Sequence, residues 1–465
     1  MAARRLRSRG LPALIAAVLA VSAVSAAGLE KCTDPIADVA LLAGEGWIIG
    51  GTGVPDPAIG DYMSQVQERY LPALPLFTGQ TTFTDLTYHA LTTPEEFWPV
   101  FGGLKFADSL AQGVALLDDA VRAPLQAGSD VTVFGFSQSA TLATLHMQDL
   151  IENPPGGDYD PDHLRFVLIG DPNNPIGGML TRMQFSDGVG PYFSSIAQHV
   201  PFLNIPLNIG ATPTSPFGTD IYTGAYDGWA NFPQDPLNLP AVINALIGIA
   251  TVHSGYPSFA NLADTVDLGT IGDTNFYLIP GQLPMLWPLY QVPYALPVFA
   301  ELIAPVLKLV IDWGYGNPGD PDAGIRVDGH DPIGAAGPWP VTASGHLADI
   351  SGVAGFLPRM DPLQMLAGLQ YAGAQTVAGP INEILREAGQ QPLPDAFANA
   401  LLTGYHLTNG LDQLVLGGWN EITTGLNLDD VIGPDAIFNG APLIPGQPVL
   451  DLVGVGFNAF NLFGA

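Results

Sequence analysis

Short apolar runs alternate with amphipathic stretches along much of the chain. Apolar runs of strand length lie at residues 46–50, 130–136 and 164–170, and each ends at a glycine or a polar turn. Between them, residues 62–71 and 106–125 place apolar side chains at helical spacing. This order predicts an α/β fold with a mostly parallel central sheet flanked by helices.

The run at 130–136 leads into a single serine, Ser137, and a helical stretch follows to about residue 151. A nucleophile elbow needs this layout, because its serine sits in a strained turn where the residues two before and two after it must be small. Here they are Gly135 and Ser139. The pattern predicts that Ser137 is a nucleophile. An ordinary strand-to-helix turn is the alternative, since Gly-x-Ser recurs by chance in a chain with 55 glycines.

Candidate partners for the serine follow it in the chain. Asp227 comes at the end of a strand-like run, and His253 follows an apolar helical stretch. Nucleophile, acid, histidine is the chain order of α/β-hydrolases. Asp171 is an alternative acid, although its side chain could instead cap its own turn. The remaining histidines are predicted to be surface or structural residues: His89, His146, His163, His199, His330, His346 and His406.

A glycine-rich loop at residues 50–53 follows the first predicted strand. Its backbone N–H groups suit the second half of an oxyanion hole, so we predict donors at Gln138 and at Thr52 or Gly53. A phosphate cradle is the alternative for this loop. It is disfavoured because no Lys follows at Walker spacing and no G-x-G-x-x-G is completed.

Taken together, these motifs resemble the PE-PPE domain family, an α/β-hydrolase group of actinobacterial cell envelopes related to cutinase-like serine esterases. The resemblance implies a Gly-x-Ser-x-Ser serine hydrolase with Ser137, Asp227 and His253 as its triad, acting as an esterase on acyl chains or as an acyltransferase that builds envelope glycolipids. A protein that keeps the fold without the activity is a further alternative. The matching segments are Gly50-Gly-Thr-Gly-Val-Pro, Gly135-Phe-Ser-Gln-Ser, Leu168-Ile-Gly-Asp-Pro-Asn-Asn-Pro, Tyr226-Asp-Gly-Trp-Ala-Asn-Phe-Pro, Val252-His and Phe276-Tyr-Leu-Ile-Pro through Leu283-Pro-Met-Leu.

The chain is predicted to have four segments. Residues 1–27, with an Arg-rich start and an apolar run, read as a signal peptide or N-terminal anchor, which predicts a secreted or cell-envelope protein. Residues 38–317 form the PE-PPE-type hydrolase domain, 318–340 a Gly/Pro-rich linker, and 341–465 a helical accessory region of unknown role. Many family relatives carry a PE or PPE module where this chain has its leader, which favours general export.

Composition limits the kinds of partner and ligand that the chain is expected to bind. The net charge of −30 disfavours nucleic acid. Cys32 is the only cysteine, so it cannot form a disulfide within the chain. Its context favours a structural or free thiol, and no disulfide-linked partner is expected. The sequence shows no Cys/His cluster, and no metal or cofactor is predicted. Residues 283–311 are rich in Leu, Pro and aromatic residues. They are interpreted either as a core helix with the segment that leads into it or as a wall for the acyl chain of an ester or glycolipid substrate.

Overall fold

The computed structural model describes residues 44–71, 86–182, 199–200, 202–206, 209–233, 238–258, 262, 265–292, 295–315, 362–408, 410–411 and 414. The chain divides into two units, 1–42 and 43–465, and all described residues belong to the second. The predicted leader at 1–27, Cys32 and the predicted linker at 318–340 lie outside the described residues.

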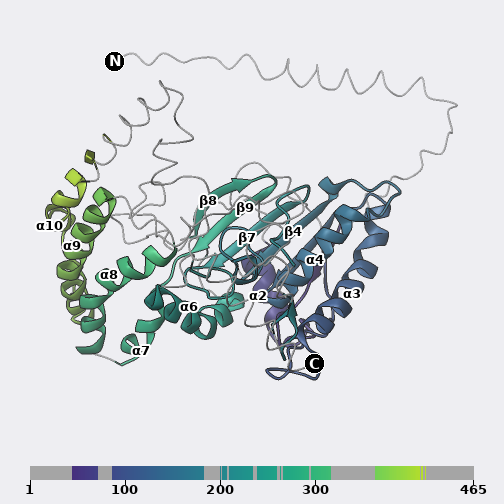
Figure 1. The fold of residues 1–465 in the computed structure, drawn as a ribbon, viewed down its shortest axis with the longest axis horizontal. Helices are drawn as coiled ribbons and strands as arrows, with labels where there is room; N and C mark the ends of the chain where they lie inside the picture. Colours follow the sequence, from purple (N-terminus) through teal and green to yellow (C-terminus); the bar gives the residue numbers. More distant parts are fainter. Residues whose placement is uncertain are drawn as a thin grey trace, which may run out of the picture. The chain divides into compact units, whose positions relative to one another are not determined.

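The centre of the fold is a seven-stranded sheet in the order β2-β1-β3-β4-β7-β9-β8. Figure 1 shows β4, β7, β9 and β8 side by side in this sheet. All neighbouring strands run parallel except β8, which pairs antiparallel with β9. Parallel neighbours place their carboxyl ends at one edge, where sites assemble in such sheets. The strands are β1 Glu45–Ile48, β2 Thr87–Ala90, β3 Val131–Phe136, β4 Leu164–Ile169, β7 Gly218–Gly224, β8 Val266–Ile271 and β9 Thr274–Ile279, with a separate two-stranded pair, β5 His199–Val200 and β6 Ile205–Pro206.

Both faces of this sheet are covered, which explains why its inner strands are continuous apolar runs. Along β3, Val133 points into the cluster formed with α3 (Phe106–Gln126) and α4 (Gln138–Glu152). The next residue, Phe134, points into the opposite cluster with α2 (Tyr62–Arg69). Alternate strand residues thus fill two separate cores, and the predicted mostly parallel sheet flanked by helices is confirmed.

Beyond β7 the chain is largely helical. The longer helices here are α6 Leu239–Thr251, α8 Ala295–Tyr315 and α9 Pro362–Glu387, and the shorter ones are α7 Trp287–Tyr290 and α10 Asp395–Leu401. One more short helix, α5 Met179–Arg182, lies between β4 and β7. Three 3₁₀ segments complete the described elements: η1 Pro161–His163, η2 His253–Ser258 and η3 Pro284–Leu286. Within the region 341–465, the structure describes the helices α9 and α10 and residues 388–394, 402–408, 410–411 and 414, and the rest lies outside the described residues.

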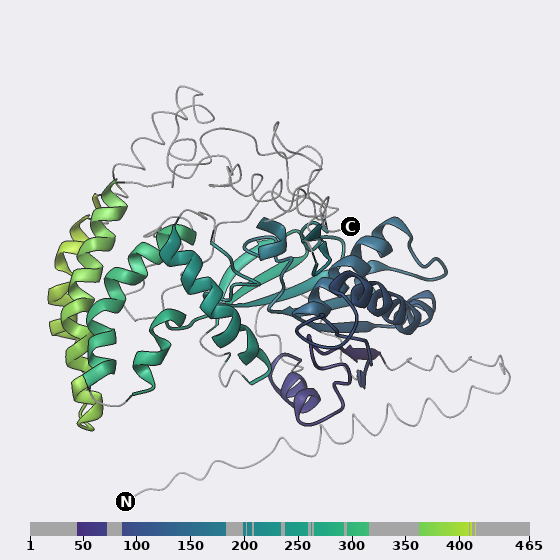
Figure 2. The same ribbon diagram turned by 60° about the horizontal axis from the view of Figure 1, so that its bottom comes forward.

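The helix α8 is amphipathic and contacts both α6 and α9 (Figure 2). One face contributes Ile303, Leu307 and Ile311 to a core cluster shared with α6. Leu309 lies against Gly368 of α9, where a Cβ would come within 2.7 Å of the leucine. Part of the segment 283–311 is therefore core, and the domain boundaries at 317 and 341 stay predictions.

Candidate active site

The site is centred on Ser137, between β3 and α4. Its backbone φ and ψ are 58° and −112°, a strained conformation for a residue with a side chain. A Cβ at Gly135 would lie 2.8 Å from the carbonyl oxygen of Ser139, so position 135 must be glycine. Ser139 is fully buried, and its Oγ accepts from Phe136 N over 2.7 Å. Ser137 thus lies in a strained strand-to-helix turn with small residues on both sides.

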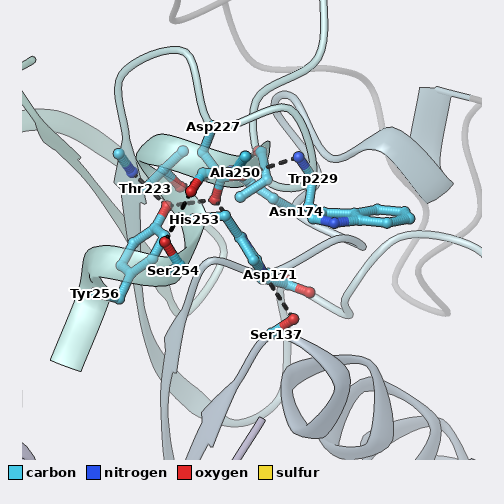
Figure 3. A network of polar contacts seen from close by, with 12 residues as sticks. Ser137, Asp171, Asn174, Thr223, Asp227, Trp229, Ala250, His253, Ser254 and Tyr256 are labelled. Carbon is cyan, nitrogen blue, oxygen red and sulfur yellow. Dashed lines mark hydrogen bonds and ion pairs between the residues drawn. The ribbon is translucent and has the colours of Figure 1, made fainter. Parts of the chain in front are cut away.

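His253 lies between Ser137 and Asp227 (Figure 3). Its Nδ1 is 2.8 Å from Asp227 Oδ2, and its Nε2 is 2.7 Å from Ser137 Oγ. A carboxylate can only accept, so Nδ1 carries the proton in the neutral ring and Nε2 is left to accept from the serine hydroxyl. The ring packs beside Phe136 and Tyr256, and Gly170 leaves room for it, because a Cβ there would lie 3.1 Å from His253 Cε1. This is the relative arrangement that a serine nucleophile and its base require.

Asp227 is fully buried and accepts two hydrogen bonds besides the one from His253. Trp229 N donates to Oδ1 over 2.9 Å, and the Tyr256 hydroxyl donates to Oδ2 over 2.8 Å. Burial, and next the charge of Asp227, raise the pKa of Tyr256 well above its usual value, so this hydroxyl stays a donor. Sequence reasoning missed Tyr256, which is three residues after His253 and has no motif of its own.

The carboxylate of Asp171, the alternative acid, bonds to its own turn and to Thr212. Its Oδ1 accepts from Asn173 N over 2.9 Å, and its Oδ2 accepts from Thr212 Oγ1 over 2.6 Å. Burial raises its pKa to about 6, against the lowering effect of these two hydrogen bonds. Asp171 therefore caps its own turn, and Asp227 is the carboxylate within hydrogen-bond distance of His253.

The loop after β1 approaches the elbow closely. A Cβ at Gly51 would lie 2.8 Å from the Phe136 ring, so this approach depends on glycine. The predicted donor Gly53 is wrong, because the loop turns there with φ 85° and directs its N–H to the Glu95 carbonyl, 2.9 Å away. Thr52 remains as the candidate from this loop, since its N–H makes no hydrogen bond within the described part of the chain.

The side chain of Gln138 joins the two halves of this predicted oxyanion hole. Its Oε1 accepts from Thr52 Oγ1 over 2.7 Å. Its Nε2 donates to the Glu96 carbonyl over 3.0 Å and to Ser109 Oγ over 2.8 Å. Sequence reasoning identified only the backbone N–H of Gln138, which has no hydrogen bond of its own among the described residues. The buried amide therefore fixes the glycine loop, α3 and the elbow to one another.

No group of three or more His, Cys, Asp or Glu residues within the described ranges is arranged to hold a metal ion. Among the same residues, no helix has the length and apolar character needed to cross a membrane.

Comparison with known proteins gives the family. Residues 84–316 match the model of the PE-PPE domain. The chain belongs to this family. The match begins after β1, yet β1 and the Thr52 loop belong to the same sheet and the same site. The α/β-hydrolase-like fold and the resemblance read from the sequence are thereby both confirmed.

Three relatives from Mycobacterium tuberculosis place the chain within the family. It is 41% identical to PE family protein PE3 over 58% of this chain and 54% of that protein. It is 36% identical to esterase PE16 over 82% of this chain and 72% of that protein. It is 26% identical to diacyltrehalose acyltransferase Chp2 over 67% of this chain and 86% of that protein. This PE-PPE protein thus spans about half the length of PE3 and most of PE16.

Proposed function

We propose that this PE-PPE domain protein is a serine esterase that cleaves acyl esters through Ser137, His253 and Asp227. The observation that supports it is the unbroken hydrogen-bond relay from Ser137 Oγ through the imidazole to the buried carboxylate. The relay sits on a strained elbow at the start of a helix, where free N–H groups can stabilise negative charge. Similarity to a protein named as an esterase agrees with this proposal.

The first half-reaction acylates the serine. His253 Nε2 takes the proton of Ser137 Oγ as the oxygen attacks the ester carbonyl carbon, while Asp227 holds the imidazole in the required tautomer. The negative charge that develops on the carbonyl oxygen is stabilised by the N–H groups of Gln138 and Thr52. The carbon–oxygen bond to the leaving alcohol then breaks, and the protonated His253 gives its proton to that alkoxide.

The second half-reaction releases the acyl group. Water gives up a proton to His253 as its oxygen attacks the acyl-enzyme, and the proton returns to Ser137 when the acid leaves. An alcohol in place of water gives acyl transfer with the same residues. Similarity to a diacyltrehalose acyltransferase favours this as the second candidate, with a glycolipid acceptor such as a trehalose ester. We place the protein outside the cytoplasm, secreted or at the cell envelope, on the basis of its signal-like leader.

A fluorophosphonate probe tests the proposal directly. Wild-type protein should be labelled and should hydrolyse short p-nitrophenyl esters, and Ser137→Ala should lose both, with a rate loss of about 10⁴-fold or more. The matched control is Ser64→Ala on α2, an exposed serine that should leave labelling and rate unchanged. Labelling that is absent from wild type, or that survives in Ser137→Ala, would instead indicate an inactive binding protein or a different nucleophile.

Incubation with an acyl ester and trehalose separates the two candidate reactions. Free acid as the product identifies a hydrolase, whereas an acylated sugar identifies a transferase. The partition is read from the products by mass spectrometry with wild type, and Ser137→Ala should form neither.

A further inference from the structure

The residue before Asp227 has an unusual backbone conformation. Tyr226 has a φ of 65°, in the left-handed region that residues with a Cβ rarely adopt. It is the third residue of a turn that closes where Asp227 N donates to the Gly224 carbonyl over 3.1 Å. Turns with a positive φ at this position usually have glycine or asparagine there. A tyrosine keeps this conformation only if its surroundings hold it.

The side chain of Tyr226 is anchored on α8. Its exposed fraction is 1%, and its hydroxyl donates to Asp312 Oδ1 over 2.8 Å. The other oxygen of Asp312 accepts from Lys308 Nζ, one helical turn earlier, over 3.1 Å. The Tyr226 ring also meets Tyr315 edge to face, with centroids 5.7 Å apart and planes at 73°. A buried hydrogen bond to a charged group is stronger than one between neutral groups, so α8 fixes this ring firmly.

The helix that precedes His253 confines the same turn from another direction. At Gly248 of α6, a Cβ would lie 1.9 Å from the carbonyl oxygen of Tyr226. Only glycine allows this approach, and a single residue, Val252, separates the end of α6 from His253. The backbone of the turn therefore packs against the helix leading to the base, while its tyrosine side chain is held by α8.

We infer that Tyr226 and Asp312 are positioning residues for Asp227, so that α8 supports the acid of the proposed triad. This inference rests on the proposed esterase function. Without the anchor, Tyr226 can relax toward a negative φ, which rotates the peptide unit that joins it to Asp227. The carboxylate then leaves its position against His253 Nδ1. Such a change weakens His253 as the base in the transition state and leaves ester binding intact. We therefore expect kcat to fall while KM stays unchanged.

Substitutions on α8 and at the turn test this inference. Tyr226→Phe and Asp312→Ala should each lower kcat for a short p-nitrophenyl ester about 10- to 100-fold, with KM within about threefold. Asp312→Asn should lower kcat less than Asp312→Ala, because the amide oxygen of the asparagine still accepts a hydrogen bond from the tyrosine hydroxyl. The control is Tyr88→Phe, which removes a tyrosine hydroxyl that donates to the Leu71 carbonyl from the edge strand β2, and it should stay within about twofold of wild type.

A double-mutant cycle separates positioning from general loss of structure. If Tyr226 acts through Asp227, Tyr226→Phe should have almost no further effect on the single-turnover rate in an Asp227→Asn background. Two outcomes would overturn the inference while Ser137-dependent activity remains: equal effects of Tyr226→Phe in both backgrounds, or a Tyr226→Phe rate equal to that of Tyr88→Phe. Activity that does not depend on Ser137 would overturn the proposed function itself. Thermal unfolding of each variant monitors folding, and Asp312→Asn keeps the test open if Asp312→Ala fails to fold.

Discussion

Three residues at the candidate site hold φ values that side chains disfavour: Glu95 at 46°, Ser137 at 58° and Tyr226 at 65°. The Glu95 carbonyl accepts from the loop beside Thr52, Ser137 is the candidate nucleophile, and Tyr226 precedes the candidate acid. Each such conformation costs about 1–3 kcal/mol. The strained residues therefore lie at the predicted oxyanion loop, at the candidate nucleophile and beside the candidate acid, where catalysis requires a fixed geometry.

At the residue scale, the two candidate acids should differ sharply. Asp227→Asn should lower kcat about 10⁴-fold, because the amide no longer fixes the tautomer of His253. Asp171→Asn should leave kcat within about tenfold, since Asp171 contacts its own turn and Thr212 instead. Steady-state rates of both variants, each shown to be folded by circular dichroism, decide between them. The opposite ranking would transfer the role of acid to Asp171.

Glu95 should make stability depend on pH. Its carboxyl is almost fully buried with Oε2 unpaired, and burial raises its pKa to about 8 from a usual 4.5, against a lowering hydrogen bond from Thr93. The folded state thus keeps a proton on Glu95 that the unfolded state releases as pH rises above 4.5. The contribution of Glu95 to the unfolding free energy is therefore fully present below pH 4.5 and is lost as pH rises to about 8. Each unit by which the pH rises in this window lowers the free energy of unfolding by up to about 1.4 kcal/mol.

Urea unfolding from pH 5 to pH 8 measures this effect. Glu95→Gln should remove most of the decline in unfolding free energy, and a smaller decline caused by Asp171 should persist up to about pH 6. Glu68→Gln, at an exposed position on α2, should keep the wild-type slope. An unchanged slope in Glu95→Gln would show that Glu95 is not the group responsible.

At the scale of elements, the amide of Gln138 connects three segments that are distant in sequence. Ser109 in the first turn of α3 is its buried partner and also accepts from Glu96 N over 3.0 Å. Ser109→Ala leaves two donors without an acceptor and loosens the contact between α3 and the elbow. We expect a fall of about tenfold in kcat with little change in KM, because the oxyanion donors lose their fixed positions.

Parallel kinetics on Ser109→Ala and on Ser64→Ala check this expectation. Ser64 lies on α2, where its exposed hydroxyl donates to the Asp61 carbonyl of the same helix end, so its removal should not alter kcat. If Ser109→Ala raises KM and leaves kcat unchanged, the Gln138 side chain affects substrate binding instead of the oxyanion hole.

At the scale of the whole molecule, the substrate should carry a medium or long acyl chain. The segment 283–311 is partly core, yet α8 also leaves Phe299, Leu302 and Val306 on an exposed face. Each buried methylene contributes about 0.8 kcal/mol, so four more methylenes in a fitting groove could raise kcat/KM about 100-fold. A C2 to C16 ester series, kept below micelle formation, measures the trend. A steady fall beyond C4 would identify a short-chain esterase, with 283–311 serving only as structure.

The sequence determined the order of the elements and the identity of the candidate triad. Apolar periodicity fixed the strands and helices around the sheet, because burial on two faces requires continuous apolar runs. The elbow could be read locally, since steric crowding around Ser137 forces small residues at fixed offsets. Chain order then favoured Asp227 and His253, but left Asp171 open.

Only the tertiary structure decided which groups face one another. Asp171 and Asp227 both follow central strands, and the direction of each side chain depends on turn geometry that the residue types do not encode. Gly53 looked suitable as a donor until the fold of the loop gave its N–H to Glu95. Tyr256, Ser109 and Asp312 act across long sequence separations, and such contacts arise from packing between elements, for which a single sequence carries no local signal.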